Sequence, residues 1–402
     1  MSIFSWELLP WMVLACAVLA YGVFGLGVIA TVRHTRRRSF RVDGALPPVS
    51  LLKPLKGIEE SLEQNLETFF TQDYPGRVQI VFSTAEPDDE ALPVARRVAA
   101  RHPEVDVDFV LSDPEYGLNP KVSNLAGALR AAEHDLVLQS DANVRARPDY
   151  LRRIVSELIA ERGALLSSMV VGVGERSPGA AMENLQLSAM IGPATCFALH
   201  FFGVTCVIGK SMLFRRSELE ELGGLESVKD VLAEDYLLGR AFEKAGRKVI
   251  LSTTVAENVN RDITVDRFMS RHARWLKMRA VIHPPAFAAD LFANPVGLGV
   301  IGTALSGFDL RALAILLALV IAKASTDAFV LRRTRGEPMS LRMLAFAPLK
   351  DVLLLAIWPY SAVSRSIEWR GSRLRLGWYT RLRHDEGALP VRVARRVLRA
   401  LA

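Results

Sequence analysis

The sequence predicts a doubly wound α/β domain with a mainly parallel sheet, flanked by apolar helices toward both ends of the chain. Short apolar runs alternate with helical patterns in the first half of the chain. The runs lie at 49–52, 78–82, 105–111 and 135–139, and the helical patterns at 60–71, 91–101 and 121–132. This alternation is typical of a parallel sheet. In addition, 50% of the 402 residues are hydrophobic, and long uncharged stretches lie near both ends.

The first apolar stretch, 8–32, contains no charged side chain. Its 25 residues exceed the roughly 20 that a helix needs to cross a bilayer. A cleaved secretory signal has its basic flank before the apolar core, whereas Arg33, Arg36, Arg37 and Arg38 follow this one. We therefore predict a retained anchor over residues 1–38, with its C-terminal end in the cytoplasm.

Further apolar stretches follow a central domain that we place at 39–285. Stretches 291–308 and 310–331 are separated by a turn at Asp309, and the second ends in Arg332, Arg333 and Arg335. A fourth stretch, 343–363, is interrupted by prolines and charges and precedes more arginines. A full span would put those arginines outside, so we favour a re-entrant or interfacial segment; an ordinary span with imperfect charge bias is the alternative. We thus expect membrane segments at 286–365 and a basic cytoplasmic tail at 366–402.

The net charge of +7 does not predict a nucleic-acid partner. The basic residues gather at the ends of the apolar stretches and in the tail, where anionic lipid headgroups attract them. The three cysteines form no CxxC pair, which argues against a disulfide framework or a zinc site. The sequence therefore predicts a multi-pass membrane protein (bacterial inner membrane or equivalent) with its central domain in the cytoplasm.

Two polar groups follow predicted strands, at the sheet edge where α/β domains bind ligands. Asp141 and Asn143 come directly after the run 135–139, and their oxygens suit Mg²⁺ or Mn²⁺ bridging two phosphates. The alternative is an ordinary turn. Asp88 and Asp89 lie in an acidic loop after 78–82. They are candidates to contact the ribose or base of a nucleotide; the alternative is a solvated loop with no ligand.

Two more groups begin predicted helices. Asn119 and Lys121 precede a helical pattern, where free N–H groups and the ammonium can bind a phosphate or a sugar hydroxyl. Asp235 follows Glu234 at the start of an apolar helix and is a candidate general base. For both groups, simple helix capping is the alternative.

A basic aromatic group lies just before the later apolar stretches. Arg271, Arg274 and Trp275 are three and four residues apart and so share one face of a helix. Two arginines on one face can hold a diphosphate and stabilise it as a leaving group. A basic helix facing lipid is the alternative. The segment 207–211 is not a P-loop, because its upstream glycine position is Val204.

In this order, Asp89, Asp141, Asp235 and Arg271-x-x-Arg274-Trp275 resemble the motifs of membrane-bound GT-A glycosyltransferases. A narrower set resembles ceramide glucosyltransferases: LLKPLKG at 51–57, NLETFF at 65–70, QDYP at 72–75, NPK at 119–121 and AEDY at 233–236. The resemblance implies a UDP-sugar donor, a membrane lipid hydroxyl as acceptor, inversion at the anomeric carbon and Mg²⁺ or Mn²⁺ on Asp141. Asp235 is then the base, with Arg271, Arg274 and Trp275 at the leaving UDP.

Several alternatives to ceramide glucosylation stay open. Residues 188–196 lack a histidine found in animal ceramide enzymes, and Ala142-Asn143 stands where a second acid would strengthen a metal site. Bacterial hopanoid glycosyltransferases share much of the pattern, so a polycyclic lipid alcohol is the rival acceptor. A processive polysaccharide synthase would need more spans, and a non-catalytic membrane scaffold is a third possibility. The sugar and the oligomeric state are not predicted.

Overall fold

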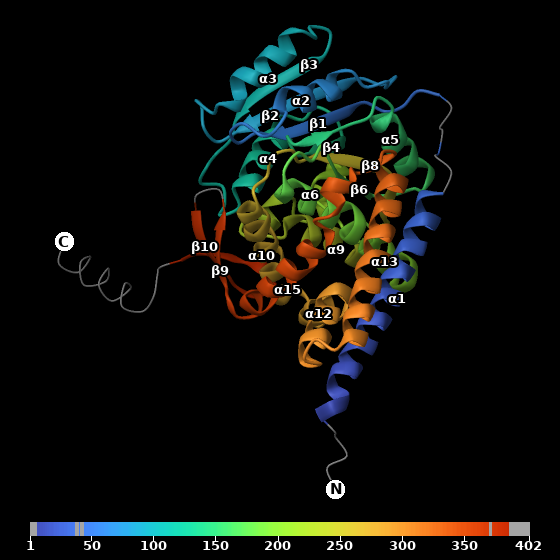
Figure 1. Ribbon diagram of the computed structural model, residues 1–402. Coiled ribbons are helices and arrows are strands. Elements are labelled where there is room, and N and C mark those ends of the chain that lie inside the picture. The colour runs from blue at the N-terminus through green and yellow to red at the C-terminus, as the bar shows by residue number, and fades with distance from the viewer. Residues whose placement is uncertain (1–5, 37–39, 41–43, 370–371, 386–402) are drawn as a thin grey trace, which may run out of the picture.

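The computed structural model describes residues 6–36, 40, 44–369 and 372–385. Its main sheet has eight strands in the order β3-β2-β1-β4-β7-β6-β8-β5 (Figure 1). They are β1 Val49–Pro54, β2 Val78–Thr84, β3 Asp106–Leu111, β4 Leu136–Ser140, β5 Val144–Arg145, β6 Leu165–Val173, β7 Ser211–Arg215 and β8 Val249–Val259. β3, β2, β1 and β4 are parallel, as are β6 and β8, whereas β7 is antiparallel to β4 and β6.

Helices cover both faces of this sheet because its strands alternate their apolar side chains. Leu51 and its neighbours on one face pack against α2 (Leu62–Phe70), α3 (Ala91–Ala100) and α5 (Tyr150–Ala160). Leu52 on the other face packs with α4 (Pro120–Ala131) and α9 (Glu234–Lys244). The predicted α/β fold is confirmed, as a mixed sheet in which parallel pairings predominate.

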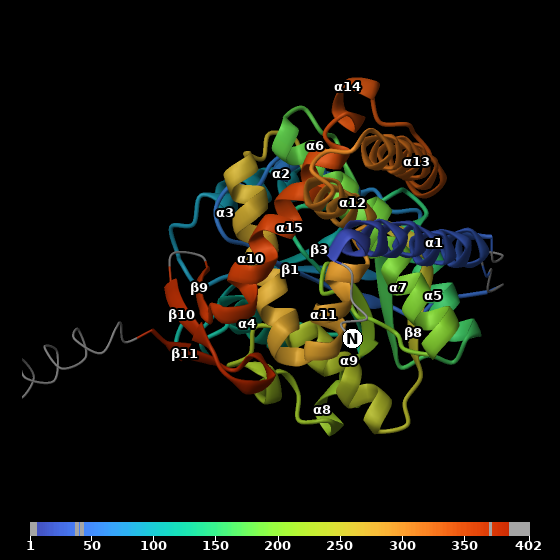
Figure 2. The same ribbon diagram turned by 60° about the horizontal axis from the view of Figure 1, so that its bottom comes forward.

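Long apolar helices extend from one end of the domain. Among the described residues, three helical segments are long and apolar enough to cross a membrane: Trp6–Thr35, Pro178–Phe202 and Leu310–Arg335. The first and last contain α1 (Leu9–Thr35) and α13 (Leu310–Arg335), which lie side by side in both views (Figures 1 and 2). These segments indicate membrane association, as predicted.

The segment Pro178–Phe202 was not predicted as a possible span. It consists of α6 (Pro178–Leu185), a π-helical turn η2 (Gln186–Ile191) and α7 (Gly192–Phe202). Glu183 and several small polar residues interrupt its run of apolar side chains. In its most apolar stretch of 18 residues, 44% are buried inside the protein.

The predicted stretch 291–308 is not one straight helix. α11 (Pro284–Phe292) and α12 (Pro295–Leu305) meet at 61°, so together they form a broken span or a re-entrant loop. Pro295 begins the second helix, and the Asn294 side chain accepts from the Gly297 N–H at 2.8 Å. The expected turn at Asp309 is present and caps α13.

The fourth apolar stretch forms α15 (Ala347–Val363), which packs against α10 (Val265–Ile282) of the central domain. Its 17 residues include Pro359 and fall short of the roughly 20 that a span requires, which favours the re-entrant or interfacial alternative. The remaining short helices are η1 (Trp6–Leu8), α8 (Arg216–Glu221), η3 (Leu225–Val228), α14 (Leu341–Leu344) and η4 (Trp378–Thr380).

Part of the predicted basic tail is folded. β9 (Ser366–Trp369), β10 (Ser372–Leu376) and β11 (Leu382–His384) form an antiparallel sheet. Its apolar side chains pack against Leu232, which lies just before α9. Residues 386–402 of the predicted tail lie outside the described residues.

Candidate active site

The pairing of β4 with β7 brings Asp141 and Lys210 together. Ser140 pairs with Ser211 in the antiparallel ladder, so Asp141, just past β4, lies opposite Lys210, just before β7. The Asp141 N–H donates to the Lys210 carbonyl at 3.1 Å. The backbone register therefore fixes this pair at the carboxyl end of β4.

Two ammonium groups contact the Asp141 carboxylate. Lys121 Nζ lies 3.1 Å from one oxygen and Lys210 Nζ lies 3.0 Å from the other. Burial raises the pKa of Asp141, but the two lysines outweigh this effect and hold it well below its usual value. Burial lowers the pKa of Lys121, yet the carboxylates around it raise it above the ordinary value. For Lys210 burial prevails, and its pKa is lowered.

A third lysine, Lys53 of β1, lies fully buried beneath Asp141. Its Nζ donates to Ser140 Oγ at 3.0 Å and to the Asp141 carbonyl at 3.1 Å, and it sits 3.4 Å from the centre of the Phe69 ring. Burial lowers its pKa well below the ordinary value, and Asp141 opposes the shift. Lys53 and Lys210 were not identified from the sequence; a lysine directly after the apolar run 49–52 was the available signal for Lys53.

Gly209 connects this cluster to Asp235. Its N–H donates to Asp235 Oδ2 at 2.6 Å, and its carbonyl accepts from Lys121 Nζ at 2.8 Å. A Cβ at this position would lie 2.9 Å from Asp235 Oδ2 and 3.0 Å from Lys121 Nζ, so the close approach needs glycine. Asp235 Oδ1 also accepts from the Tyr236 N–H at 2.7 Å. The carboxylate of Asp235 is thus oriented by two backbone donors, and the residue remains partly exposed.

Asn119 is the N-cap of α4 and also joins α4 to the start of α9. Its side-chain oxygen accepts from the N–H groups of Lys121 and Val122. Its amide donates to the Val231 carbonyl at 2.8 Å and to Glu234 Oε2 at 3.3 Å. Helix capping, the alternative considered for Asn119, is therefore present.

Glu234 lies buried beside this cluster, with Oε1 3.3 Å from Lys121 Nζ. Burial raises the pKa of Glu234 to about 7; Lys121 opposes the shift and Asp235 adds to it. A carboxyl group with this pKa changes its charge near neutral pH. From the sequence, Glu234 was recognised only as the neighbour of Asp235.

This raised pKa predicts a pH-dependent stability. The folded protein binds the Glu234 proton more tightly than the unfolded chain does, so its stabilising contribution declines as pH rises from 4.5 toward about 7. Glu234→Gln removes this titration. Between roughly pH 5.5 and pH 8 its melting temperature in detergent should fall less than that of the wild type. Glu220→Gln, at an exposed glutamate, is the control; equal slopes in all three proteins would contradict the assignment.

Arg271 and His272 of α10 converge on Glu183 of α6. Arg271 Nη1 lies 2.9 Å from Oε1, and His272 Nε2 lies 3.0 Å from Oε2. Burial lowers the pKa of Arg271, but Glu183 raises it above the ordinary value, with further contributions from Glu59 and Asp141. The guanidinium is thus within electrostatic reach of the lysine cluster. Glu183 was not identified from the sequence.

The other two residues of the basic aromatic group lie on the same helix. The Trp275 ring packs edge-on against His272, with centroids 5.1 Å apart. Arg274 is partly exposed. Their predicted roles at a leaving group are not tested by these contacts and stay predictions.

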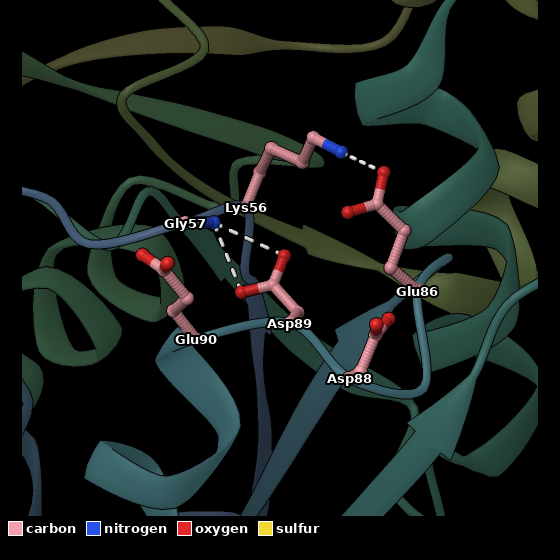
Figure 3. A pocket seen from close by; sticks show the side chains of 6 residues that line it. All are labelled: Lys56, Gly57, Glu86, Asp88, Asp89 and Glu90. Atoms are coloured by element: carbon pink, nitrogen blue, oxygen red, sulfur yellow. Dashed lines mark hydrogen bonds and ion pairs between the residues drawn. The ribbon is translucent and has the colours of Figure 1, made fainter.

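The acidic loop after β2 lines a separate open pocket of about 400 Å³ (Figure 3). Both Asp89 carboxylate oxygens accept from the Gly57 N–H, at 2.9 and 3.0 Å, and one also accepts from the Ala91 N–H. Asp89 therefore shapes the pocket by holding the loop after β1. Asp88 is exposed on its rim, beside the ion pair of Lys56 with Glu86.

The C-terminal sheet holds the loop that leads into Glu234 and Asp235. The carbonyl and hydroxyl of Thr380 accept from the N–H groups of Leu232 and Ala233, at 3.0 and 3.2 Å. The Leu382 N–H donates to the Asp230 carbonyl at 2.7 Å. Thr380 has a φ of 56°, an unfavourable value that persists only where surrounding contacts impose it. Residues predicted as tail thus help to position the candidate base.

No group of three His, Cys, Asp or Glu side chains suited to a metal ion occurs among residues 6–36, 40, 44–369 and 372–385.

Comparison with known proteins decides the family. The profile of glycosyl transferase family 21 matches residues 11–382, most of the chain. The chain belongs to this family. The predicted resemblance and the assignment as a glycosyltransferase are confirmed, and the mixed α/β sheet is the GT-A-like architecture that the resemblance implied.

Two curated relatives of this family 21 glycosyltransferase come from Caenorhabditis elegans. Ceramide glucosyltransferase 1 is 32% identical over 261 residues, which cover 64% of this chain but only 55% of the relative. Ceramide glucosyltransferase 3 is 27% identical over 369 residues, covering 90% of this chain and 80% of the relative. The chain thus spans little more than half of the first relative. Among solved structures, a mannosyltransferase from Pyrobaculum calidifontis in complex with GDP-Man and Mn²⁺ is 18% identical, with a TM-score of 0.48, and the match covers 88% of this chain and 99% of that one.

Proposed function

We propose that this glycosyltransferase moves one sugar from a UDP-sugar to a hydroxyl group of a ceramide-like membrane lipid. One observation carries the proposal: Lys121, Lys210, Asp141 and Asp235 gather at one edge of the sheet through direct contacts or through Gly209. Cations and a partly exposed carboxylate side by side suit a diphosphate leaving group and a general base. The family and its ceramide glucosyltransferase relatives support the reaction class.

The donor would lie along the carboxyl edge of the sheet. Its diphosphate would meet Lys121 and Lys210, with Arg271 close enough to act electrostatically and Arg274 one helical turn further along α10. Its nucleoside would extend toward the pocket after β1 and β2, where Asp88 lies on the rim and Asp89 holds the wall. Asn119 would act by placing Lys121.

The reaction would be a single displacement. Asp235 takes the proton of the lipid hydroxyl while that oxygen forms a bond to the anomeric carbon. The bond from this carbon to the diphosphate oxygen breaks, and its electron pair leaves with UDP. Attack from the face opposite the leaving group inverts the configuration. The cations beside Asp141 offset the charge that develops on UDP.

Mg²⁺ or Mn²⁺ is the cofactor that the resemblance implied, on Asp141, and the spacing of Asn143 offered a further oxygen. Both Asp141 carboxylate oxygens and Asn143 Oδ1 are already within 3.1 Å of lysine ammonium groups. These residues do not fit a divalent cation in this arrangement, so we assign no step to one.

The acceptor would approach from the membrane side. α10, which carries Arg271, Arg274 and Trp275, packs against α15, and α15 lies on the side of the domain from which α12 and α1 extend (Figure 1). The arginines after α1 and at the end of α13 support a cytoplasmic position for the active site, which is also the side on which UDP-sugars are made.

Product analysis tests this proposal. Membranes containing this chain would be incubated with UDP-glucose or UDP-N-acetylglucosamine and with ceramide or a hopanoid alcohol, followed by UDP release and lipid mass spectrometry. We expect a ceramide with one added hexose. A glycosylated hopanoid in place of the glycosylated ceramide would contradict the proposed acceptor. A polymeric product would indicate a processive synthase. Lipid profiles that do not change with donor, without UDP release, would indicate a scaffold.

A further inference from the structure

The oxygens on which a metal site would depend are occupied by lysines. Lys121 takes one carboxylate oxygen of Asp141 and Lys210 takes the other, at 3.1 and 3.0 Å. These side chains are only 12%, 18% and 21% exposed for Lys121, Lys210 and Asp141, respectively. A divalent cation binds through the same carboxylate oxygens. It would have to displace an ammonium group that has little room to move into solvent.

The neighbouring oxygens also accept hydrogen bonds from lysine side chains. Asn143 Oδ1 accepts from Lys210 Nζ at 2.9 Å, and the Asp141 carbonyl accepts from Lys53 Nζ at 3.1 Å. A cation placed here would face the positive charges of Lys121 and Lys210 at short range in a partly buried site, where repulsion is poorly screened. The donor set thus suits an anion beside Asp141 rather than a cation on it.

Two separate elements hold the lysines in place. Lys210 is fixed by the register of β4 with β7, and Lys121 stands in the first turn of α4, capped by Asn119. The carbonyl of Gly209 accepts from Lys121 Nζ at 2.8 Å and gives it a further fixed contact. Asp141 therefore acts as an anchor that keeps two ammonium groups at one spot, with a combined charge equal to that of one divalent cation.

We propose that Lys121 and Lys210 take the place of a divalent cation at the donor diphosphate, so that sugar transfer needs no metal ion. This rests on the proposed function and specifies how its donor is bound. Lys210 Nζ contacts Asp141 and Asn143 and so has one N–H that can donate to a phosphate oxygen, whereas Lys121, whose three N–H groups face Asp141, Gly209 and Glu234, contributes its positive charge. When the bond between the anomeric carbon and the diphosphate oxygen breaks, the two lysines stabilise the electron pair that stays on that oxygen.

The test measures UDP binding and transfer by purified protein in detergent, in EDTA and in excess Mg²⁺ or Mn²⁺. We expect the same UDP affinity and the same rate in both conditions. Lys210→Met should weaken UDP binding in EDTA by about ten-fold or more, since a hydrogen bond to a charged group is lost. It also releases Asp141 Oδ2 and Asn143 Oδ1, so Mn²⁺ should restore part of the binding. Lys210→Arg should bind UDP without metal.

Lys248→Met is the matched control, because Lys248 pairs with Glu161 and takes no part in the cluster. Isothermal titration with Mn²⁺ alone adds a readout that does not depend on activity: Lys210→Met should bind Mn²⁺ more tightly than the wild type. If the wild type binds UDP or transfers sugar only with Mg²⁺, the metal-free proposal is wrong, but the proposed function is not affected. Failure to bind UDP in every condition would reject the proposed donor as well, whereas transfer to another lipid would leave this inference standing.

Discussion

Asp235→Asn is expected to lower the rate of sugar transfer by about 10²–10⁴-fold, the usual effect of removing a general base. UDP binding should change little, because the ion pairs that hold Lys121 and Lys210 are formed with Asp141 and Glu234. The Asp235 oxygens accept from Gly209 and Tyr236 N–H groups. An amide can preserve one of these contacts but cannot take a proton from the acceptor.

Asp230→Asn is a suitable control for this variant. Asp230 also lies near the start of α9 and accepts a backbone N–H, that of Leu118, at 2.8 Å. The comparison uses UDP release under saturating donor, with UDP affinity measured separately. A near-normal rate in Asp235→Asn would remove the base assignment and direct attention to Glu234. Equal losses in both variants would show that the effect is structural.

The α/β domain could be predicted from local patterns because its strands and helices are short and strongly periodic. The helical pattern 91–101 corresponds to α3 at Ala91–Ala100, and 121–132 to α4 at Pro120–Ala131. β6, β7 and β8 were not predicted, because they lie in a weakly patterned region where pairing partners are distant in sequence. The antiparallel insertion of β7 is a non-local property, and it is what places Lys210 opposite Asp141.

Candidate site residues were found where a motif marked them and missed where only tertiary contact does. Asp141, Asn143, Lys121, Asn119 and Asp235 all join the same network. Lys53 is a strand residue, and Gly209 and Lys210 lie in a segment whose only recognisable pattern was an incomplete P-loop. Their place in the site depends on residues distant in the sequence, which no local motif shows. The donor-binding role of Asp89 stays a prediction; what the fold adds is that its carboxylate accepts from the Gly57 N–H.

The membrane segments, too, were predicted in part from local sequence and missed in part where tertiary contacts matter. The uncharged run 8–32 was sufficient to predict α1, and the arginines after 331 marked the end of α13. α13 nevertheless contains Lys323 and Asp327, whose charges pair at 2.7 Å one helical turn apart and lie buried among the helices. The segment Pro178–Phe202 was missed in the sequence, where Glu183 interrupts it; in the fold this carboxylate pairs with Arg271 and His272 of α10.

Glu183→Gln is expected to impair transfer through Arg271 rather than by contact with substrate. Glu183 is fully buried and accepts from both Arg271 and His272. Removing one partner of a buried ion pair leaves an uncompensated charge and typically costs about 3–5 kcal/mol. The guanidinium of Arg271 would then lose the contact that holds it, and with it the position from which it acts on the diphosphate.

Glu257→Gln separates this role from general destabilisation. Glu257 also accepts from two basic side chains, Arg145 and Arg147, but it lies at the β5–β8 edge of the sheet. Both variants should melt at lower temperature. Only Glu183→Gln should also raise the KM for the UDP-sugar and lower kcat when assayed well below its melting temperature, and Glu183→Asp should recover part of the loss. If the two variants lose activity in proportion to their stability, Glu183 is a structural residue, and the link from α6 through Arg271 to the lysine cluster has no part in catalysis.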